Sequence, residues 1–331
     1  MANSETVTGE GSRQIAYSMV EFNTKQWLSH HMGASAGLLK RSIYLIVRPF
    51  LSFKYSRYLS SQTIRVYQPR FCLGARGLPL ESRRAWGSKY LKHVREALML
   101  VQGTGTGWDV ISWAKLRPRQ IIATDMFSFE DSWEDITRYC YDHYKVRVDF
   151  RLSAIEDVPF LESNSVDFIA SDAVYEHCRD LPGVMRESFR ILKPGGCIYA
   201  SYGPLYFCAG GDHFSGRGGL ENCFNHLRLD PEAYQQYIEA YQEEIEDFQG
   251  GARYIELNLF SYLTTRQYID IYREANFVVK GLILEISPDA LRFKKLYSDK
   301  FDFLVNKYKD KCCQDDLLIK ANLIILQKLH K

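Results

Sequence analysis

The sequence has no two cysteines at Cys-x-x-Cys spacing. Its 331 residues include eight cysteines, namely Cys72, Cys140, Cys178, Cys197, Cys208, Cys223, Cys312 and Cys313. Structural zinc sites commonly use that spacing, so we expect no metal site in this chain. Thiols without a paired pattern fit a reducing compartment better than a disulfide framework. We therefore expect a cytoplasmic protein.

A hydrophobic run long enough to cross a bilayer is also missing. The stretch from Ile43 to Phe53 is apolar, but Arg48 and Pro49 interrupt it. A membrane-spanning helix needs about 20 predominantly apolar residues. The first 14 residues are polar and lack the apolar core of a signal peptide. These features predict a chain without a transmembrane segment.

Acidic residues are absent from Phe22 to Leu80, although the whole chain has a net charge of only +2. The basic residues in this stretch are Lys25, Lys40, Arg41, Arg48, Lys54, Arg57, Arg65, Arg70 and Arg76. The small net charge argues against a dedicated nucleic-acid binder. Two interpretations of the basic stretch stay open: a cap helix with its cations in water, or an interfacial helix facing an anionic partner.

A glycine-rich loop follows the most strand-like stretch of the chain. Leu98 to Val101 is an apolar run typical of a strand buried on both faces, and Gln102-Gly103-Thr104-Gly105-Thr106-Gly107 follows directly. A helix is expected from Asp109 to Leu116, and a second strand from Gln120 to Thr124, ending at Asp125. A glycine backbone lets a ligand approach closely, and a carboxylate at the next strand tip can accept two ribose hydroxyls.

The third glycine of a dinucleotide-binding fingerprint is missing from this loop. A Gly-x-Gly-x-x-Gly pattern starting at Gly103 requires glycine at position 108, where the chain has Trp108. The spacing is Gly-x-Gly-x-Gly instead. A glycine-rich turn without a ligand is the alternative interpretation of this loop alone.

Strands and helices alternate along the rest of the chain. Further strands are expected at Val146 to Phe150, Val166 to Ser171, Cys197 to Tyr202, Phe277 to Ile286 and Leu323 to Gln327, and further helices at Arg83 to Val94, around Trp133, at Leu181 to Leu192, from Pro231, from Thr265 to Ala275 and within Pro288 to Lys311. This order predicts an α/β fold with a doubly wound, mostly parallel sheet of seven strands. We expect a disordered tail over residues 1–13, a helical N-terminal cap over 14–92, a core over 93–204, an inserted lid over 205–262 and the C-terminal part of the core over 263–331.

Six stretches, in order, resemble the motifs of the class I S-adenosylmethionine-dependent methyltransferases, most like the type 11 group acting on small molecules and sugars. They are the glycine loop, Asp125, Ile155 to Phe160, Ser165 to Ile169, Val174 to His177, and Glu187 to Gly196, the last being similar to Arg-Val-Leu-Lys-Pro-Gly-Gly. The resemblance implies a Rossmann-like fold and S-adenosyl-L-methionine as cofactor.

The resemblance also assigns residues around the cofactor. By position these are Gln102, Gly103, Thr104, Gly105, Gly107, Asp125, Met126, Ala154, Ile155, Ser171 and Asp172. Asp125 would bind the ribose, and Met126 and Ile155 would lie against the adenine, although both could equally be ordinary core residues. The family has an acid where this chain has Val101, so Gln102 is expected to replace that carboxylate with a neutral oxygen.

On the acceptor side, the loop after the fifth strand carries our candidates. We expect His213, oriented by Asp212, to act as general base, with Tyr202 at the same site. Tyr206, Phe207, His177 and Tyr175 are the candidate substrate-binding residues, and His226 is a weaker candidate base. The alternatives are a surface loop held by a local Asp-His contact, and a purely structural role for Glu176 and His177.

The leading hypothesis is methyl transfer by in-line displacement to a hydroxyl or amine of a small metabolite or sugar, with nucleic acid not expected as a partner. One alternative is an RNA or lipid-linked acceptor bound through the basic segment. Another is a cofactor-binding protein without catalysis, suggested by Val101 and Gln102. A homodimer is left open.

Overall fold

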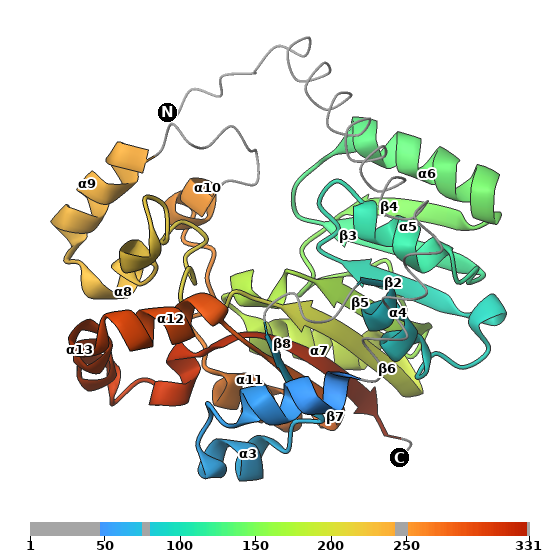
Figure 1. The fold of residues 1–331 in the computed structure, drawn as a ribbon. Coiled ribbons are helices and arrows are strands. Elements are labelled where there is room, and N and C mark those ends of the chain that lie inside the picture. The colour runs from blue at the N-terminus through green and yellow to red at the C-terminus, as the bar shows by residue number, and fades with distance from the viewer. Residues whose placement is uncertain (1–46, 75–79, 242–250, 330–331) are drawn as a thin grey trace.

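A computed structural model describes residues 47–74, 80–241 and 251–329 (Figure 1). The strands of the described residues form one eight-stranded sheet in the order β1-β7-β8-β6-β5-β2-β3-β4. Their bounds are β1 Phe71–Gly74, β2 Leu98–Gln102, β3 Gln120–Asp125, β4 Arg147–Leu152, β5 Val166–Asp172, β6 Leu192–Tyr202, β7 Phe277–Ile286 and β8 Ile319–Lys328. The predicted α/β class and mostly parallel sheet are confirmed.

Only β8 runs against its neighbours, since it pairs antiparallel with β6 and β7 while the other pairs are parallel. The carboxyl ends of the parallel strands therefore meet at one edge. The chain order reverses between β2 and β5, which places the loop after β2 at a switch point, where open α/β sheets bind ligands. The edge of the sheet at the carboxyl ends of the parallel strands is called the carboxyl edge.

Side chains from alternate strand positions build two separate cores, one on each face of the sheet. Met99 and Val101 of β2 join one core with α5 and α6, whereas Leu98 and Leu100 join the other with α7 and α11. The sheet is thus covered by helices on both faces, as the alternation of strands and helices predicted.

The described helices have the following bounds: α3 Ser61–Tyr67, α4 Leu80–Ser88, α5 Trp108–Ala114, α6 Glu130–Tyr144, α7 Leu181–Ile191, α8 Asn225–Arg228, α9 Pro231–Tyr241, α10 Gly251–Glu256, α11 Thr265–Glu274, α12 Pro288–Leu296 and α13 Ser298–Tyr308. Their starts follow local chemistry. Thr264 and Gln267 form a capping box at α11, and Asp180 and Ser287 accept backbone N–H groups at α7 and α12.

Several predicted boundaries and one count differ from the structure. Seven strands were expected, and the eighth is the edge strand β1, which lies in the region expected to be mostly helical. The helix expected over Arg83 to Val94 ends at Ser88, because the N–H groups of Tyr90 and Leu91 close tight turns and His93 has φ of 49°. The helical region from Pro288 is two helices that break at Tyr297, where φ is −131° and ψ is 52°.

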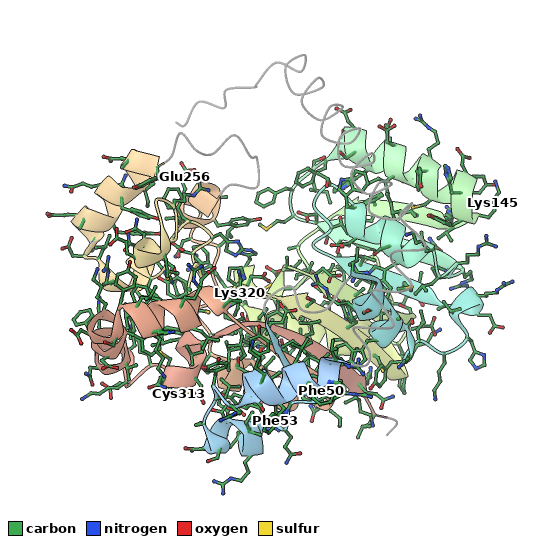
Figure 2. The ribbon with its side chains drawn as sticks, in the orientation of Figure 1. Phe50, Phe53, Lys145, Glu256, Cys313 and Lys320 are labelled. Atoms are coloured by element: carbon green, nitrogen blue, oxygen red, sulfur yellow. The ribbon has the colours of Figure 1, made fainter. Side chains whose placement is uncertain are left out.

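The segment 205–262 contains irregular chain followed by three short helices, α8, α9 and α10, which lie together on one side in Figure 1, across from α5 and α6. The predicted tail over residues 1–13 lies outside the described residues. Within the described part of the basic stretch, residues 47–56 are helical, and Phe50 and Phe53 are 75% and 68% exposed (Figure 2). In the ranges that the structure describes, no helix is long and apolar enough to span a membrane.

Candidate functional site

The glycine loop after β2 is held to the neighbouring strand by its backbone. The N–H groups of Gly103 and Thr104 both donate to the carbonyl oxygen of Thr124, at 2.8 and 3.1 Å. Gly103 has φ of +63°, and a Cβ atom there would lie 2.3 Å from Val174. At Gly107, with φ of +93°, a Cβ atom would lie 2.9 Å from Ile136 and Phe150. Both glycines are therefore required by the packing of the loop.

Gly105 differs from these two glycines. Its φ is +49°, but a Cβ atom placed there would meet no described atom within 4 Å. Its N–H donates to Asp125 Oδ2 at 2.7 Å, and its carbonyl oxygen accepts from Trp133 Nε1 at 2.8 Å. The loop is thus held firmly at Gly105, and no described atom fills the space that a side chain would occupy there.

Asp125 ends β3 beside this space, and its side chain is almost fully buried at 8% exposure. Its Oδ1 accepts the N–H of Phe127 at 2.9 Å, and its Oδ2 accepts that of Gly105. Burial raises the pKa of this carboxyl, and the backbone N–H groups oppose that rise. Each oxygen keeps a further lone pair, so the carboxylate can accept two neighbouring hydroxyl groups.

The predicted adenine contacts lie on either side of this carboxylate. Met126 follows it and is 57% exposed, whereas Ile155 is buried at 8% in the core beside α7. Ala154 precedes Ile155 in the loop after β4. In the same loop, the N–H of Ser153 donates to the carbonyl oxygen of Asp125 at 2.8 Å. Met126 therefore has surface available for a ligand, and Ile155 has little.

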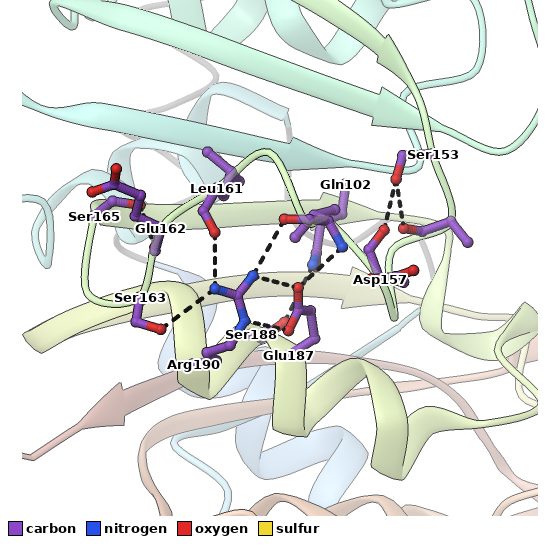
Figure 3. Close-up of polar contacts among 12 residues, drawn as sticks. Gln102, Ser153, Asp157, Leu161, Glu162, Ser163, Ser165, Glu187, Ser188 and Arg190 are labelled. Atoms are coloured by element: carbon purple, nitrogen blue, oxygen red, sulfur yellow. Dashed lines mark hydrogen bonds and ion pairs between the residues drawn. The ribbon is translucent and has the colours of Figure 1, made fainter.

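The loop that carries Ala154 and Ile155 is fixed by Glu187 and Arg190 of α7 (Figure 3). Arg190 pairs with Glu187 at 2.6 Å and donates to the carbonyl oxygens of Val158 and Leu161 at 3.2 and 2.8 Å. Glu187 in turn accepts the N–H of Val158 at 3.0 Å. Both residues belong to the stretch Glu187 to Gly196 that resembles a family motif. In this structure, the start of that stretch anchors the loop after β4.

Gln102 points to the α7 side of the sheet. Its Oε1 accepts from the Tyr175 hydroxyl at 3.0 Å, and its Nε2 donates to Ser188 Oγ at 3.2 Å. Both ends of the amide are thus engaged inside the fold. Next to it across the sheet, the buried hydroxyl of Ser171 has no partner among the described residues.

A buried arginine that the sequence did not single out lies next to this edge. Arg84 of α4 is 5% exposed and pairs with Asp172 at 2.6 Å and with Asp109 at 2.8 Å. Its guanidinium lies 4.5 Å from the Trp113 ring centroid. Burial and the nearby Asp172 carboxylate raise the pKa of Asp109 to about 6, against the effect of Arg84. Through Arg84, helix α4 is thereby joined to the end of β5 and the start of α5.

The acceptor-side candidates fall into two groups. His177 and His213 lie together, with ring centroids 4.8 Å apart, and Tyr254 stacks on His177 at 4.1 Å. Tyr206 packs on Tyr262 at 4.4 Å. The remaining tyrosines and Phe207 lie in the interior: the Tyr202 hydroxyl is bonded by Tyr272 and Asn322, Tyr175 is bonded to Gln102, and Phe207 is 6% exposed.

Asp212 does not make a hydrogen bond to His213 within the described residues. Its oxygens accept from the N–H and hydroxyl of Ser215 and from the Tyr234 hydroxyl, and it lies 3.5 Å from His226. The orientation of His213 by Asp212 stays a prediction, and the Asp212 carboxylate is held by these other groups. His213 itself has φ of +61°, and its buried Nε2 has no hydrogen-bond partner among the residues that the structure describes.

Glu176 lies beside these histidines at 2% exposure. The N–H of Gly203 donates to its Oε1 at 2.8 Å, while its Oε2 is buried and has no partner in the described ranges of the chain. Burial raises the pKa of Glu176 to about 7, and burial with the nearby His177 lowers that of His213 to about 3. The His213 imidazole is thus neutral near pH 7, with a free nitrogen at the carboxyl edge.

Comparisons with known proteins match the part of the chain that contains the glycine loop. Residues 100–200 match the family model described as a methyltransferase domain. The chain is 32% identical over 123 residues to the biotin biosynthesis bifunctional protein BioHC of Cellvibrio japonicus, a match that spans 36% of this chain and 23% of that protein. The match therefore covers about a quarter of the curated relative.

Solved structures also align with the chain at low identity. One is a putative S-adenosylmethionine-dependent methyltransferase from Listeria monocytogenes, at 18% identity and a TM-score of 0.46, covering 75% of this chain and 97% of that one. Another is an S-adenosylmethionine-dependent methyltransferase from Mesorhizobium loti, at 14% identity and a TM-score of 0.45, covering 75% and 96%.

Proposed function

We propose that residues 100–200, which match the model of a methyltransferase domain, form a class I, S-adenosylmethionine-dependent methyltransferase domain, and that the whole protein methylates a hydroxyl or amine of a small molecule. The observation that carries the proposal is the open space at Gly105, next to a buried carboxylate, at the switch point of the sheet. When bound, S-adenosylmethionine supplies a methyl group on a sulfonium, which is activated for in-line displacement.

The loop supports the donor through groups already in place. We assign Gly103, Thr104, Gly105 and Gly107 to the methionine and ribose side, and Asp125 to the ribose hydroxyls. Met126, Ala154 and Ile155 are assigned to the adenine, and Gln102, Ser171 and Asp172 to the methionine end. The buried hydroxyl of Ser171 supports its assignment, because an unpartnered buried donor is costly. Gln102 and Asp172 support the methionine end indirectly, because their side chains already make hydrogen bonds within the fold.

The acceptor lies, in this proposal, over the carboxyl ends of β5 and β6, beside His177, His213 and Tyr206. Positioning supplies most of the rate, because the donor is already activated. His213 is our candidate base, and the free Nε2 of its neutral imidazole supports that role. Segment 205–262 is our candidate lid, supported by its contacts to this edge: the Ser261 N–H donates to the Glu176 carbonyl oxygen at 2.8 Å.

Turnover of labelled S-adenosylmethionine with a panel of hydroxyl- and amine-bearing metabolites and sugars tests the proposal. We expect one acceptor class to be methylated, and His213→Ala to reduce turnover at least tenfold. His143→Ala is the control, because His143 lies exposed on α6. Donor binding without methyl release to any acceptor would favour a binding protein instead. Near-normal turnover of His213→Ala would remove this residue from the mechanism.

A second candidate is a lipid-linked acceptor reached through the basic helix. The exposed rings of Phe50 and Phe53, with Lys54 and Arg57 nearby, favour it. Sedimentation with vesicles of anionic and of neutral phospholipid tests it. Binding to anionic vesicles that is lost in Phe50→Ser/Phe53→Ser would support this candidate. Equal sedimentation of the variant and the unchanged chain would exclude it.

We also infer a reducing compartment, in agreement with a cytoplasmic location. All eight cysteines are free thiols, and five of them are buried. No disulfide framework is needed to hold this core.

A further inference from the structure

Three side chains from different segments converge at the carboxyl edge. Glu176 and His177 follow β5, and His213 follows β6; one ligand atom of each lies within 4.8 Å of the others. We propose that Glu176, His177 and His213 form a binding site for a divalent transition-metal ion of the Zn²⁺ type. The cysteine spacing gave no indication of such a site, because this one contains no cysteine.

Two of these three residues each have a buried polar atom without a hydrogen-bond partner in the part of the chain that the structure describes. Glu176 Oε2 and His213 Nε2 make no hydrogen bond within the described residues, although both are shielded from solvent. Buried polar atoms are nearly always paired, and an unpaired carboxylate oxygen costs more than a neutral group. Two such atoms within a few ångströms of each other can share one partner that accepts both lone pairs. A metal cation satisfies both.

The remaining atoms of these side chains are already bonded in the manner of metal ligands. Nδ1–H of His177 donates to the Leu259 carbonyl oxygen at 2.8 Å, which leaves Nε2 with its lone pair free. The Gly203 N–H holds Glu176 Oε1 at 2.8 Å. Hydrogen bonds that fix the tautomer and the carboxylate of a ligand are the usual outer support of a metal site.

The donor set selects the kind of metal. Two imidazole nitrogens and one carboxylate oxygen suit Zn²⁺ and its neighbours in the first transition row, whereas Mg²⁺ and Ca²⁺ prefer oxygen ligands. Coordination at about 2.0–2.2 Å requires the three atoms to move closer than they lie now, by rotation of the side chains. The rings of Tyr254 and Phe260, 4.1 and 6.1 Å from the His177 centroid, enclose this site on one side.

The charges that face the site are mixed. The Glu176 carboxylate and the nearby Asp212 favour a cation, whereas the Lys320 ammonium lies close enough to lower the pKa of His213. Removing this positive charge would therefore strengthen metal binding. Lys320→Met supplies a variant in which the proposed site gains affinity rather than losing it.

The step from metal binding to the acceptor rests on the proposed function, whereas metal binding itself does not. With a metal bound, His213 Nε2 serves as a ligand and no longer as the candidate base. Three protein ligands leave coordination positions open, as in catalytic zinc sites. An acceptor that presents an oxygen ligand, such as a hydroxyl beside a second oxygen, would fill them. This favours vicinal diols and hydroxy acids over simple amines.

Titration of the full chain with Co²⁺, followed by its d–d absorption, tests the metal site without any donor or acceptor present. We expect one equivalent bound in a low-symmetry nitrogen and oxygen environment, displaced by Zn²⁺. Glu176→Gln and His213→Ala should weaken binding at least tenfold, and Lys320→Met should tighten it. His143→Ala is the matched control and should bind as the unchanged chain does.

Circular dichroism of each variant separates loss of metal binding from loss of folding. Absence of the absorption in the unchanged chain would overturn the proposal even if every variant failed to fold. Equal binding by a folded His213→Ala would overturn it as well. S-adenosylmethionine binding, measured separately by calorimetry, reports on the proposed function, so the two failures are distinguishable.

Discussion

At the scale of single residues, the three glycines of the loop after β2 differ in what surrounds them. Gly103 and Gly107 are enclosed by protein side chains, whereas no atom of the described residues lies within 4 Å of a Cβ atom placed at Gly105. A methyl group at Gly105 would therefore occupy the space that we assign to the donor. This makes Gly105 the residue whose substitution separates binding from folding.

We expect Gly105→Ala to weaken S-adenosylmethionine binding at least tenfold while the protein stays folded. The left-handed backbone conformation costs about 1–2 kcal/mol for alanine. Gly219→Ala is the control, because Gly219 also has a positive φ, +132°, and open space around it. Calorimetric titration with the donor is the measurement. Unchanged affinity in Gly105→Ala would contradict the assignment of this loop.

Asp125→Asn keeps the shape of the side chain but replaces one carboxylate oxygen with an NH₂ group. Both carboxylate oxygens now accept backbone N–H groups, so one of these bonds must be lost. The ribose hydroxyl that we assign to this side chain also loses a charged acceptor. A hydrogen bond to a charged group is worth about 1.5–3 kcal/mol, so donor affinity should fall by roughly 10–150-fold. Asp149→Asn, on β4 beside Arg151, should leave the affinity unchanged. Equal affinities of the two variants would argue against a ribose contact at Asp125.

At the scale of elements, the contact between α4 and the sheet depends on one buried ion cluster. Arg84 joins α4 to Asp109 of α5 and to Asp172 at the end of β5. Removing one partner of a buried pair leaves uncompensated charge, which is far more destabilising than losing a surface pair.

Arg84→Met should lower the free energy of unfolding by about 3 kcal/mol, because two carboxylates lose their shared cation. The matched control is Arg266→Met, whose exposed pair with Asp270 at 2.7 Å is screened by solvent, so its loss should leave the free energy of unfolding nearly unchanged. Urea unfolding of both variants provides the comparison. Similar losses in the two would show that α4 is not held by this cluster.

The same cluster gives the protein a pH-dependent stability. The pKa of Asp109 is about 6 in the folded chain, above its ordinary value, so the folded state keeps the proton longer than the unfolded state. This contribution is fully present below pH 4 and is lost as the pH rises through 6. Between these values, the unfolding free energy of the unchanged chain should fall relative to that of Asp109→Asn. A difference that stays constant or grows with pH would contradict this sign.

At the scale of the whole molecule, the sequence predicted those elements whose structure depends on residues close together in the chain. The apolar run of β2, the glycine loop and Asp125 lie within about 30 residues, and the alternation of strands and helices identified the fold class. The strand β1 was missed because its four residues pair only with β7, more than 200 residues later. No local pattern marks such a strand.

The candidate site shows the same division. Arg84 was missed because its partners Asp109 and Asp172 lie 25 and 88 residues away. His213 was named from its loop, and its expected orientation by Asp212 rested on adjacency alone. The backbone at His213 has φ of +61°, and the Asp212 carboxylate bonds to Ser215 and Tyr234 instead. The short distance between His213 and Glu176 depends on how two loops pack against each other, which sequence spacing does not encode.

A crystal structure of the protein soaked with S-adenosylhomocysteine tests the central claim most directly. We expect the nucleoside over Gly105, with both ribose hydroxyls donating to Asp125 and the homocysteine directed toward Ser171. A protein side chain filling the space at Gly105, or a different nucleotide held there, would contradict the claim.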